Sequence, residues 1–102
     1  MASKIKDEKL DFLFQAILTL ETVEDCYNFF EDLCTVSEIR EMAKRLTAAR
    51  MLNNNYIYSE IAEQTGLSTA TISRVNRSLN YGNDGYDMVF ARICKDEEEK
   101  AE

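Results

Sequence analysis

Apolar residues recur at about every third or fourth position along most of the chain, a spacing that predicts helices. The first pattern covers roughly residues 6–20 and the second runs from about residue 23 to about residue 34. The third begins after Thr35 or Ser37, either of which could cap it, and stops at Asn53-Asn54-Asn55. Two helices are predicted within residues 58–79 and a last one within residues 84–94. No alternating strand pattern is present, so the sequence predicts an all-α fold.

The first predicted helix is apolar on two faces. Leu10 and Leu13 belong to one face, whereas Phe12, Ala16 and Leu20 belong to another. A helix that is apolar on two faces has to be covered on two sides. Because a small domain buries a small share of its surface, a second subunit is the natural source of the second cover. We therefore expect an oligomer.

Composition argues against enzymatic chemistry. The chain has no His, and it has no glycine-rich phosphate loop and no Cys–His or Ser–His pair. These absences remove the commonest general base and the usual nucleophile pairs. Cys26, Cys34 and Cys94 form no CxxC pair, so reduced, packed thiols are expected rather than a zinc site. The sequence predicts no enzyme, no metal and no cofactor.

Hydropathy and charge narrow the location and the partners. No run of about 18 apolar residues is present, which predicts a cytoplasmic protein without a membrane partner. The net charge is −7, but it is unevenly distributed. Three lysines and nine acids give −6 over residues 1–39, six basic and three acidic residues give +3 over residues 40–79, and three basic and seven acidic residues give −4 over residues 80–102. A local basic face inside an acidic protein can still meet phosphates.

Residues 58–79 fit a helix-turn-helix. Ile61 and Ala62 lie on the inner face of the first helix, and Gly66 falls where the chain needs a left-handed residue. Leu67 fills the turn and Ser68 can cap the second helix. The next three apolar residues recur at i, i+3 and i+7 and would face the core: Ile72, Val75 and Leu79.

The outer face of the second helix is the candidate DNA-binding surface. It combines small hydroxyl side chains with arginines, which can reach base edges and phosphates in a major groove. Lys44 on the third predicted helix adds a phosphate contact. The predicted DNA-binding residues are Lys44, Ser68, Thr69, Ala70, Thr71, Ser73, Arg74 and Arg77. The alternatives are a purely structural helical hairpin and arginines that are simply solvated.

The stretch from Gly66 to Arg74, followed by Asn76 to Leu79, resembles the reading motif of the Trp repressor. The chain to about residue 95 is similar to the YerC/YecD group of Trp-repressor-like proteins, including its helix order, Leu33-Cys34-Thr35 and Arg45. The resemblance implies an intertwined homodimer that binds a two-fold symmetric DNA operator. We expect a single domain over residues 1–95 and a disordered acidic tail over residues 96–102. The last helix either closes the dimer, as in the family, or caps its own chain.

The same resemblance implies an effector pocket. Thr35, Arg45 and Arg74 match the family residues that face the corepressor, whereas the small glycine that makes room for the indole is Val75 here. A packed interior has no spare room for an indole beside that side chain. We therefore expect no response to tryptophan, and any small-molecule effector to be of another kind. Arg45 has the alternative of being a surface or phosphate-facing residue.

The sequence thus predicts a sequence-specific DNA-binding transcriptional regulator, a repressor, that acts as a homodimer on a double-stranded operator. A different class of function is also compatible with the residues. An adaptor could keep the helix-turn-helix shell and use its acidic flanks to bind a basic protein. The salt dependence of DNA binding separates the two, since each neutralised phosphate steepens the log–log slope by about 0.9.

Overall fold

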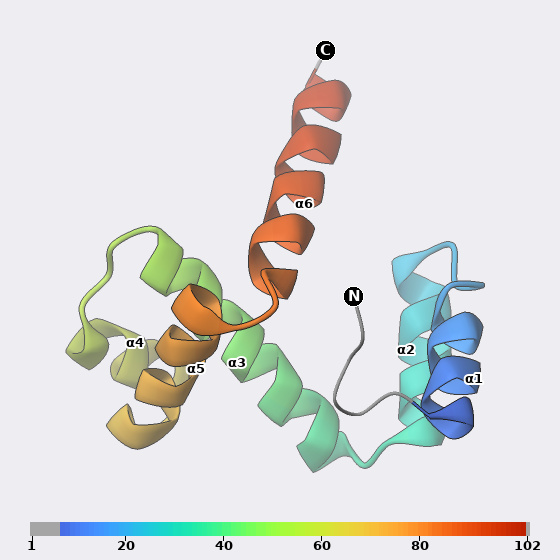
Figure 1. Ribbon diagram of the computed structural model, residues 1–102, viewed down its shortest axis with the longest axis horizontal. Helices are drawn as coiled ribbons and strands as arrows, with labels where there is room; N and C mark the ends of the chain where they lie inside the picture. The colour runs from blue at the N-terminus through green and yellow to red at the C-terminus, as the bar shows by residue number, and fades with distance from the viewer. Residues whose placement is uncertain (1–6, 102) are drawn as a thin grey trace. The chain divides into compact units, whose positions relative to one another are not determined.

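A computed structural model describes residues 7–101, and this part of the chain is entirely helical apart from its connections (Figure 1). The all-α prediction is therefore confirmed. The elements are α1 (Glu8–Ile17), α2 (Val23–Leu33), α3 (Val36–Asn53), α4 (Tyr58–Thr65), α5 (Thr69–Tyr81) and α6 (Gly85–Ala101).

Side-chain caps fix where the first helices begin. Asp7 accepts a hydrogen bond from the Leu10 amide at 2.8 Å at the start of α1, and Thr22 accepts one from the Asp25 amide at 3.0 Å at the start of α2. The predicted first helix covers residues 6–20, and residue 6 lies outside the described part. The structure ends α1 at Ile17, three residues earlier than predicted, and the following turn is held by the Thr19 hydroxyl, which donates to the Ala16 carbonyl at 2.7 Å.

Helix α3 resolves the choice between two predicted caps in favour of Thr35. The Thr35 hydroxyl oxygen accepts from the Glu38 amide at 3.1 Å, and the Glu38 carboxylate accepts from the Thr35 amide at 2.8 Å. Two amides at the helix start are thereby satisfied reciprocally. At the other end the chain leaves the helix through Asn55, which adopts a left-handed φ of 65°. Asn tolerates this conformation better than most residues, as the Asn53-Asn54-Asn55 run predicted.

The chain divides between Ile39 and Arg40 into two compact units. The first contains α1, α2 and the start of α3, and neither α1 nor α2 has a buried residue. Large apolar side chains are instead open to solvent, with exposed fractions of 73% for Phe12, 83% for Leu18 and 74% for Val23. These three side chains are not covered by the rest of this unit.

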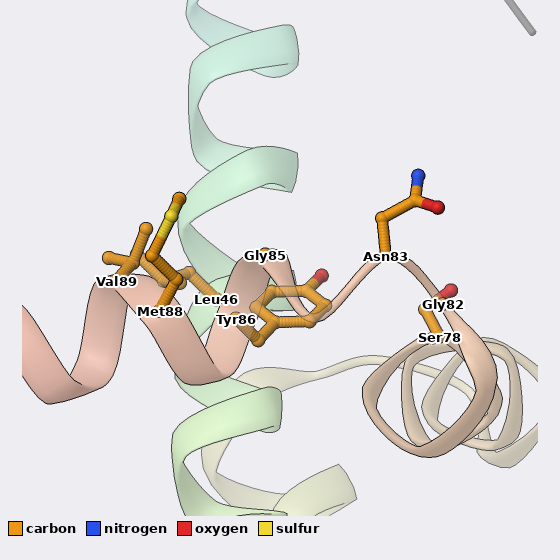
Figure 2. Close-up of a pocket in the computed structure, with 8 residues that line it drawn as sticks. All are labelled: Leu46, Ser78, Gly82, Asn83, Gly85, Tyr86, Met88 and Val89. Atoms are coloured by element: carbon orange, nitrogen blue, oxygen red, sulfur yellow. The ribbon is translucent and has the colours of Figure 1, made fainter. Parts of the chain in front are cut away.

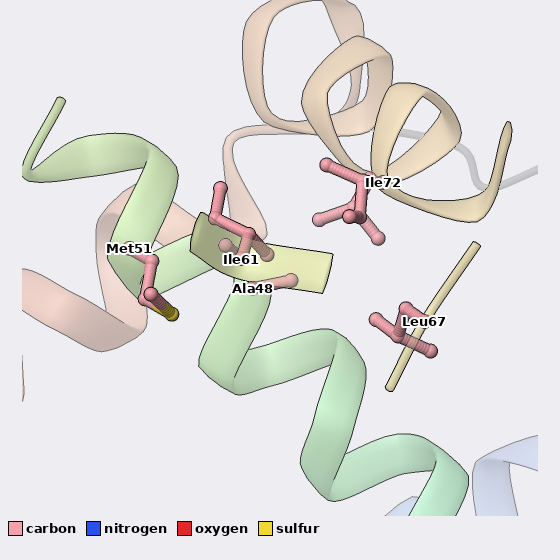
Figure 3. Close-up of a cluster of buried hydrophobic side chains, with 7 residues drawn as sticks. Ala48, Met51, Ile61, Leu67 and Ile72 are labelled. Carbon is pink, nitrogen blue, oxygen red and sulfur yellow. The ribbon is translucent and has the colours of Figure 1, made fainter. Parts of the chain in front are cut away.

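The core lies in the second unit, where the second half of α3 meets α4, α5 and the turn between them. Ile61 of α4 and Ile72 of α5 are fully buried and face one another near Ala48 (Figure 3). Burying each side chain of this size contributes about 1.5–3 kcal/mol. The buried apolar cluster is Ala48, Ala49, Met51, Ile61, Leu67, Ile72 and Val75. Tyr86 and Phe90 of α6 stack at 6.0 Å between ring centroids and pack against it.

The last helix differs from the prediction. The sequence suggested a helix to about residue 94 and a disordered tail over residues 96–102, whereas α6 continues as helix through Ala101. Residues 95–101 contain no glycine or proline that would stop a helix. Lysines and acidic residues occur there together, so opposite charges can pair one helical turn apart. Glu102 lies outside the described residues. The predicted boundary of a single domain at residue 95 stays a prediction.

Candidate nucleic-acid interface

The connection between α4 and α5 has the backbone geometry that the sequence predicts. Gly66 ends α4 with a left-handed φ of 75°, and its amide donates to the Ala62 carbonyl at 2.9 Å. Leu67 is buried beneath the turn, and Ser68 is the N-cap of α5. The two helices are in contact, and α5 also contacts α6. These features confirm the predicted turn residues.

Ser68 and Thr71 form a small polar network at the start of α5. The Ser68 oxygen accepts a hydrogen bond from the Thr71 amide at 3.1 Å, and the Ser68 hydroxyl donates to the Thr71 hydroxyl oxygen at 3.1 Å. Thr71 is half-buried, whereas Ser68 is exposed. Both side chains therefore set where α5 begins. The amides of its first turn remain aligned toward the helix N-terminus, the end that favours anions.

The outer face of α5 is bare. Thr69, Ala70, Ser73, Arg74 and Arg77 are all exposed. Within residues 7–101 neither arginine forms an ion pair, and α5 itself contains no acidic residue. Two guanidinium groups thus remain available on the side of α5 opposite Ile72 and Val75.

Thr65 is a buried polar residue that sequence reasoning did not single out. Its hydroxyl donates to the Ile61 carbonyl at 2.7 Å and accepts from the Leu67 amide at 3.2 Å. The side chain therefore ties the last turn of α4 to the connection that leads into α5. Its position directly before Gly66 was the one available signal, since a hydroxyl there can reach the amides of the turn.

Lys44, the remaining predicted phosphate contact, lies on α3 and is exposed. It belongs to the same compact unit as α5. Among the described residues no hydrogen bond or ion pair joins it to the α5 face. The α5 residues therefore form one continuous surface, and Lys44 is a separate charge on a neighbouring helix.

The residues predicted to form an effector pocket have other contacts here. Thr35 is engaged with Glu38 in the cap of α3, where the Thr35 backbone amide, and then the Thr35 side chain, hold the pKa of the Glu38 carboxyl below its usual value. Arg45 lies 3.9 Å from the Glu41 carboxylate, one helical turn away. Val75 is only 5% exposed and is part of the buried apolar cluster. Arg74 points to the solvent-exposed face of α5.

Two hollows of the second unit involve different residues. One, of about 500 Å³, lies where α5 turns into α6 and is bordered by Leu46, Gly82, Tyr86 and Met88 among others (Figure 2). The other, of about 290 Å³, lies beside the end of α3 and includes Arg50, Phe90 and Ile93. Neither hollow is lined by Thr35, Arg45, Arg74 or Val75.

The cysteines differ from the expectation of packed thiols. All three are free, but Cys26 and Cys94 are exposed and only Cys34 is half-buried. Helix periodicity placed Cys26 on an apolar stripe of α2, and this helix has no buried residue. Over residues 7–101, none of the helices combines the length and the apolar character needed to cross a bilayer.

Comparisons with known proteins agree with this geometry. Residues 8–94 match the family of the Trp repressor protein. The chain is 51% identical over 98 residues to YerC, an uncharacterized protein of Bacillus subtilis (strain 168), with 96% of this chain and 94% of that protein covered. A crystal structure of a TrpR-like protein from Eubacterium eligens ATCC 27750 superposes with a TM-score of 0.85 at 57% identity, covering 88% of this chain and 93% of the other. A solved structure from Staphylococcus aureus gives a TM-score of 0.84 at 53% identity, covering 88% and 90%. The chain belongs to the Trp repressor family.

Proposed function

We propose that this protein is a sequence-specific DNA-binding transcriptional regulator, a repressor, in which α4 and α5 form the helix-turn-helix. The observation that carries the proposal is the bare outer face of α5. Thr69, Ser73 and Arg74 are exposed there with neither an acidic neighbour on α5 nor an ion pair in the described chain. Small side chains allow a close approach to the major groove, and hydroxyls and guanidinium groups hydrogen-bond base edges.

The residues divide into two roles. Arg74 reaches guanine, and Thr69 and Ser73 lie beside it toward the helix N-terminus, the part of a reading helix that meets base edges. Arg77 lies one turn further along and holds a phosphate, together with Lys44 on α3. Ser68 and Thr71 support this surface by fixing the start of α5. Ala70 allows α5 to come close to the floor of the groove because its side chain is a single methyl group.

The active form is a homodimer. Phe12, Leu18 and Val23 of the first unit are all more than two-thirds exposed. Several large exposed apolar side chains within one small unit favour a subunit interface. A second copy supplies the cover, and a two-fold dimer presents two α5 helices about 34 Å apart, the length of one DNA turn.

Tryptophan is not the effector of this protein. Val75 is packed in the buried cluster, at the position where the family resemblance implies a glycine that makes room for an indole. Thr35 and Arg45, the other residues that the family resemblance places around a corepressor, are engaged with Glu38 and Glu41. Any effector would have a different shape and use other contacts.

The test is a salt titration of DNA binding with three proteins. The wild type, Arg77→Ala and Arg92→Ala are titrated onto fluorescent duplex DNA at several salt concentrations. Arg92 is an exposed arginine of α6 and controls for the loss of one positive charge anywhere on the surface. We expect Arg77→Ala to weaken binding and to reduce the log–log slope by about 0.9, because one phosphate contact is lost.

The control should keep the wild-type slope. Failure of the wild-type protein to bind any duplex at low salt would remove the DNA-binding function and favour a protein-interaction adaptor. Equal effects of Arg77→Ala and Arg92→Ala would show that binding depends on overall charge, and α5 would lose its assigned role.

A further inference from the structure

We infer that Tyr81 is a further DNA contact, one that binds the sugar–phosphate backbone beyond the end of the groove that α5 occupies. This inference rests on the proposed function, and it adds a residue that the sequence analysis placed outside the reading motif. Tyr81 is the last residue of α5. Its side chain is 86% exposed, more than any other large apolar or aromatic side chain in the described chain.

Tyr81 lies on the same face of α5 as the arginines. Positions 70, 74, 77 and 81 recur at i, i+4, i+7 and i+11, which places them in one stripe along a helix. The opposite face carries Ile72 and Val75, which are buried. The surface proposed to meet DNA therefore extends to the end of α5 and finishes in an aromatic ring with a hydroxyl group.

The turn after Tyr81 leaves that ring uncovered. Gly82 is the C-cap of α5, and its amide donates to the Ser78 carbonyl at 2.9 Å. A Cβ atom at this position would collide with the same carbonyl oxygen, so the tight exit requires glycine. The chain leaves α5 immediately after Tyr81 and continues to α6, which begins at Gly85.

The length of α5 determines which part of the DNA Tyr81 can meet. At about 1.5 Å per residue, Tyr81 lies about 16 Å along the axis from Ala70. The major groove of B-DNA is about 12 Å wide. When the first turn of α5 reads base edges, its last turn has passed out of the groove and reaches the backbone.

A tyrosine suits that position. Its hydroxyl donates a hydrogen bond to a phosphate oxygen, and tyrosine is among the side chains that make such contacts. The ring covers the apolar part of a deoxyribose while its tip stays polar. Arg74 and Arg77 on the same stripe have no ion-pair partner in the described chain, so Tyr81 continues a cationic surface that suits a polyanion.

The contact has a property that separates it from an arginine contact. A neutral phenol releases no condensed counterion, so its loss should weaken binding without changing the salt slope. We expect Tyr81→Phe to weaken binding about tenfold, the equivalent of one hydrogen bond to a charged group. The loss should be equal on operator and unrelated duplex, because a backbone contact carries no sequence information.

The experiment compares Tyr81→Phe, Tyr81→Ala, Tyr81→Arg and Asn80→Ala with the wild type in the same salt titration. Asn80 is the matched control. It is exposed in the same turn, but its side-chain amide donates back to the Asn76 backbone carbonyl at 3.0 Å. Tyr81→Arg should bind more tightly than Tyr81→Ala. Its log–log salt slope should be steeper than that of the wild type by about 0.9, because a cation then contacts the phosphate. Asn80→Ala should bind like the wild type.

Each other outcome overturns the inference in a recognisable way. If both Tyr81→Phe and Tyr81→Ala bind as the wild type does while Arg77→Ala is weakened, Tyr81 is not a DNA contact and the proposed function stands. If Tyr81→Ala sediments as a monomer without DNA while the wild type is a dimer, Tyr81 belongs to a subunit interface. If no variant and no wild-type protein binds DNA, the inference falls together with the proposed function.

Discussion

The Leu67 amide donates a hydrogen bond to the buried hydroxyl of Thr65 at 3.2 Å, across the residue at which the chain leaves α4. The same hydroxyl donates to the Ile61 carbonyl at 2.7 Å. One side chain thus satisfies a buried amide of the turn while remaining anchored in the helix before it. The pair therefore holds the last turn of α4 to the connection that leads into α5.

Replacing Thr65 by Val should destabilise the protein by about 1–3 kcal/mol, because the buried Leu67 amide loses its acceptor while the volume at position 65 stays nearly the same. The measurement is urea unfolding followed by circular dichroism. Thr47→Val is the matched control, since the Thr47 hydroxyl also donates to a carbonyl one turn back, that of Ala43 at 2.9 Å, but is exposed. A loss of the same size in both variants would contradict the role given to Thr65.

Gly66→Ala should cost about 1–2 kcal/mol, because an L-residue with a Cβ atom is strained in the left-handed conformation. No atom lies within 4 Å of a Cβ built at Gly66, so the cost is one of backbone conformation and not of collision. Gly85→Ala is the control, since the added Cβ also meets open space and its φ is not left-handed. Thermal unfolding should show a lower Tm for Gly66→Ala and an unchanged or higher Tm for Gly85→Ala.

The cap of α3 should respond to pH through Glu38. The Thr35 backbone amide, and then the Thr35 hydroxyl, hold the pKa of Glu38 below its usual value in the folded protein. A carboxyl whose folded-state pKa is lowered contributes stability above the ordinary glutamate pKa of about 4.3, and this contribution is lost as the pH falls through the lower folded value. The wild type should be more stable than Glu38→Gln at pH 7, and the difference should shrink to zero in acid. A difference that stays constant between neutral and acidic pH would exclude this cap as its source.

Local chemistry explains which parts of the fold the sequence could predict. Thr22, Ser68 and Gly66 act through their own backbone neighbours, and their roles could be read from spacing alone. Thr65 could not be identified in the same way, because its acceptor role depends on where the turn brings the Leu67 amide. The end of α5 was predicted at Leu79, since apolar spacing stops there, and Tyr81 therefore fell outside the motif.

Two other differences concern the exposure of Cys26 and the length of the last helix. Cys26 was predicted to be packed, whereas it is exposed on α2, a helix with no buried residue. The acidic run after Lys95 was expected to lack structure, since it has no apolar anchor. Helix α6 continues through it because no residue there breaks a helix. For the site, the sequence identified the residues on the face of α5, and the structure adds their exposure and the turn that supports them.

Under the proposed function, titration calorimetry with L-tryptophan should give no binding heat, because the buried Val75 stands where the family resemblance implies a glycine that makes room for an indole. Val75→Ala should lower the unfolding free energy by about 2 kcal/mol as buried methyl groups are removed from the core. The first measurement tests whether tryptophan can bind, and the second tests how much the packing of Val75 contributes to stability. Saturable uptake of tryptophan by the wild-type protein, at one molecule per subunit, would show that the pocket exists despite Val75.

The most direct test of the proposed function as a whole is hydroxyl-radical footprinting on DNA that the purified protein selects from random duplexes. The account predicts a selected site with two-fold symmetry, and protection of two backbone segments centred about one helical turn, or about 34 Å, apart. It further predicts that Arg74→Ala loses about 1–3 kcal/mol on the selected site and less on unrelated duplex, since the proposed role of Arg74 is to read a base. Enrichment of no common sequence, or protection of a single unpaired segment, would contradict a dimer that reads its operator through α5.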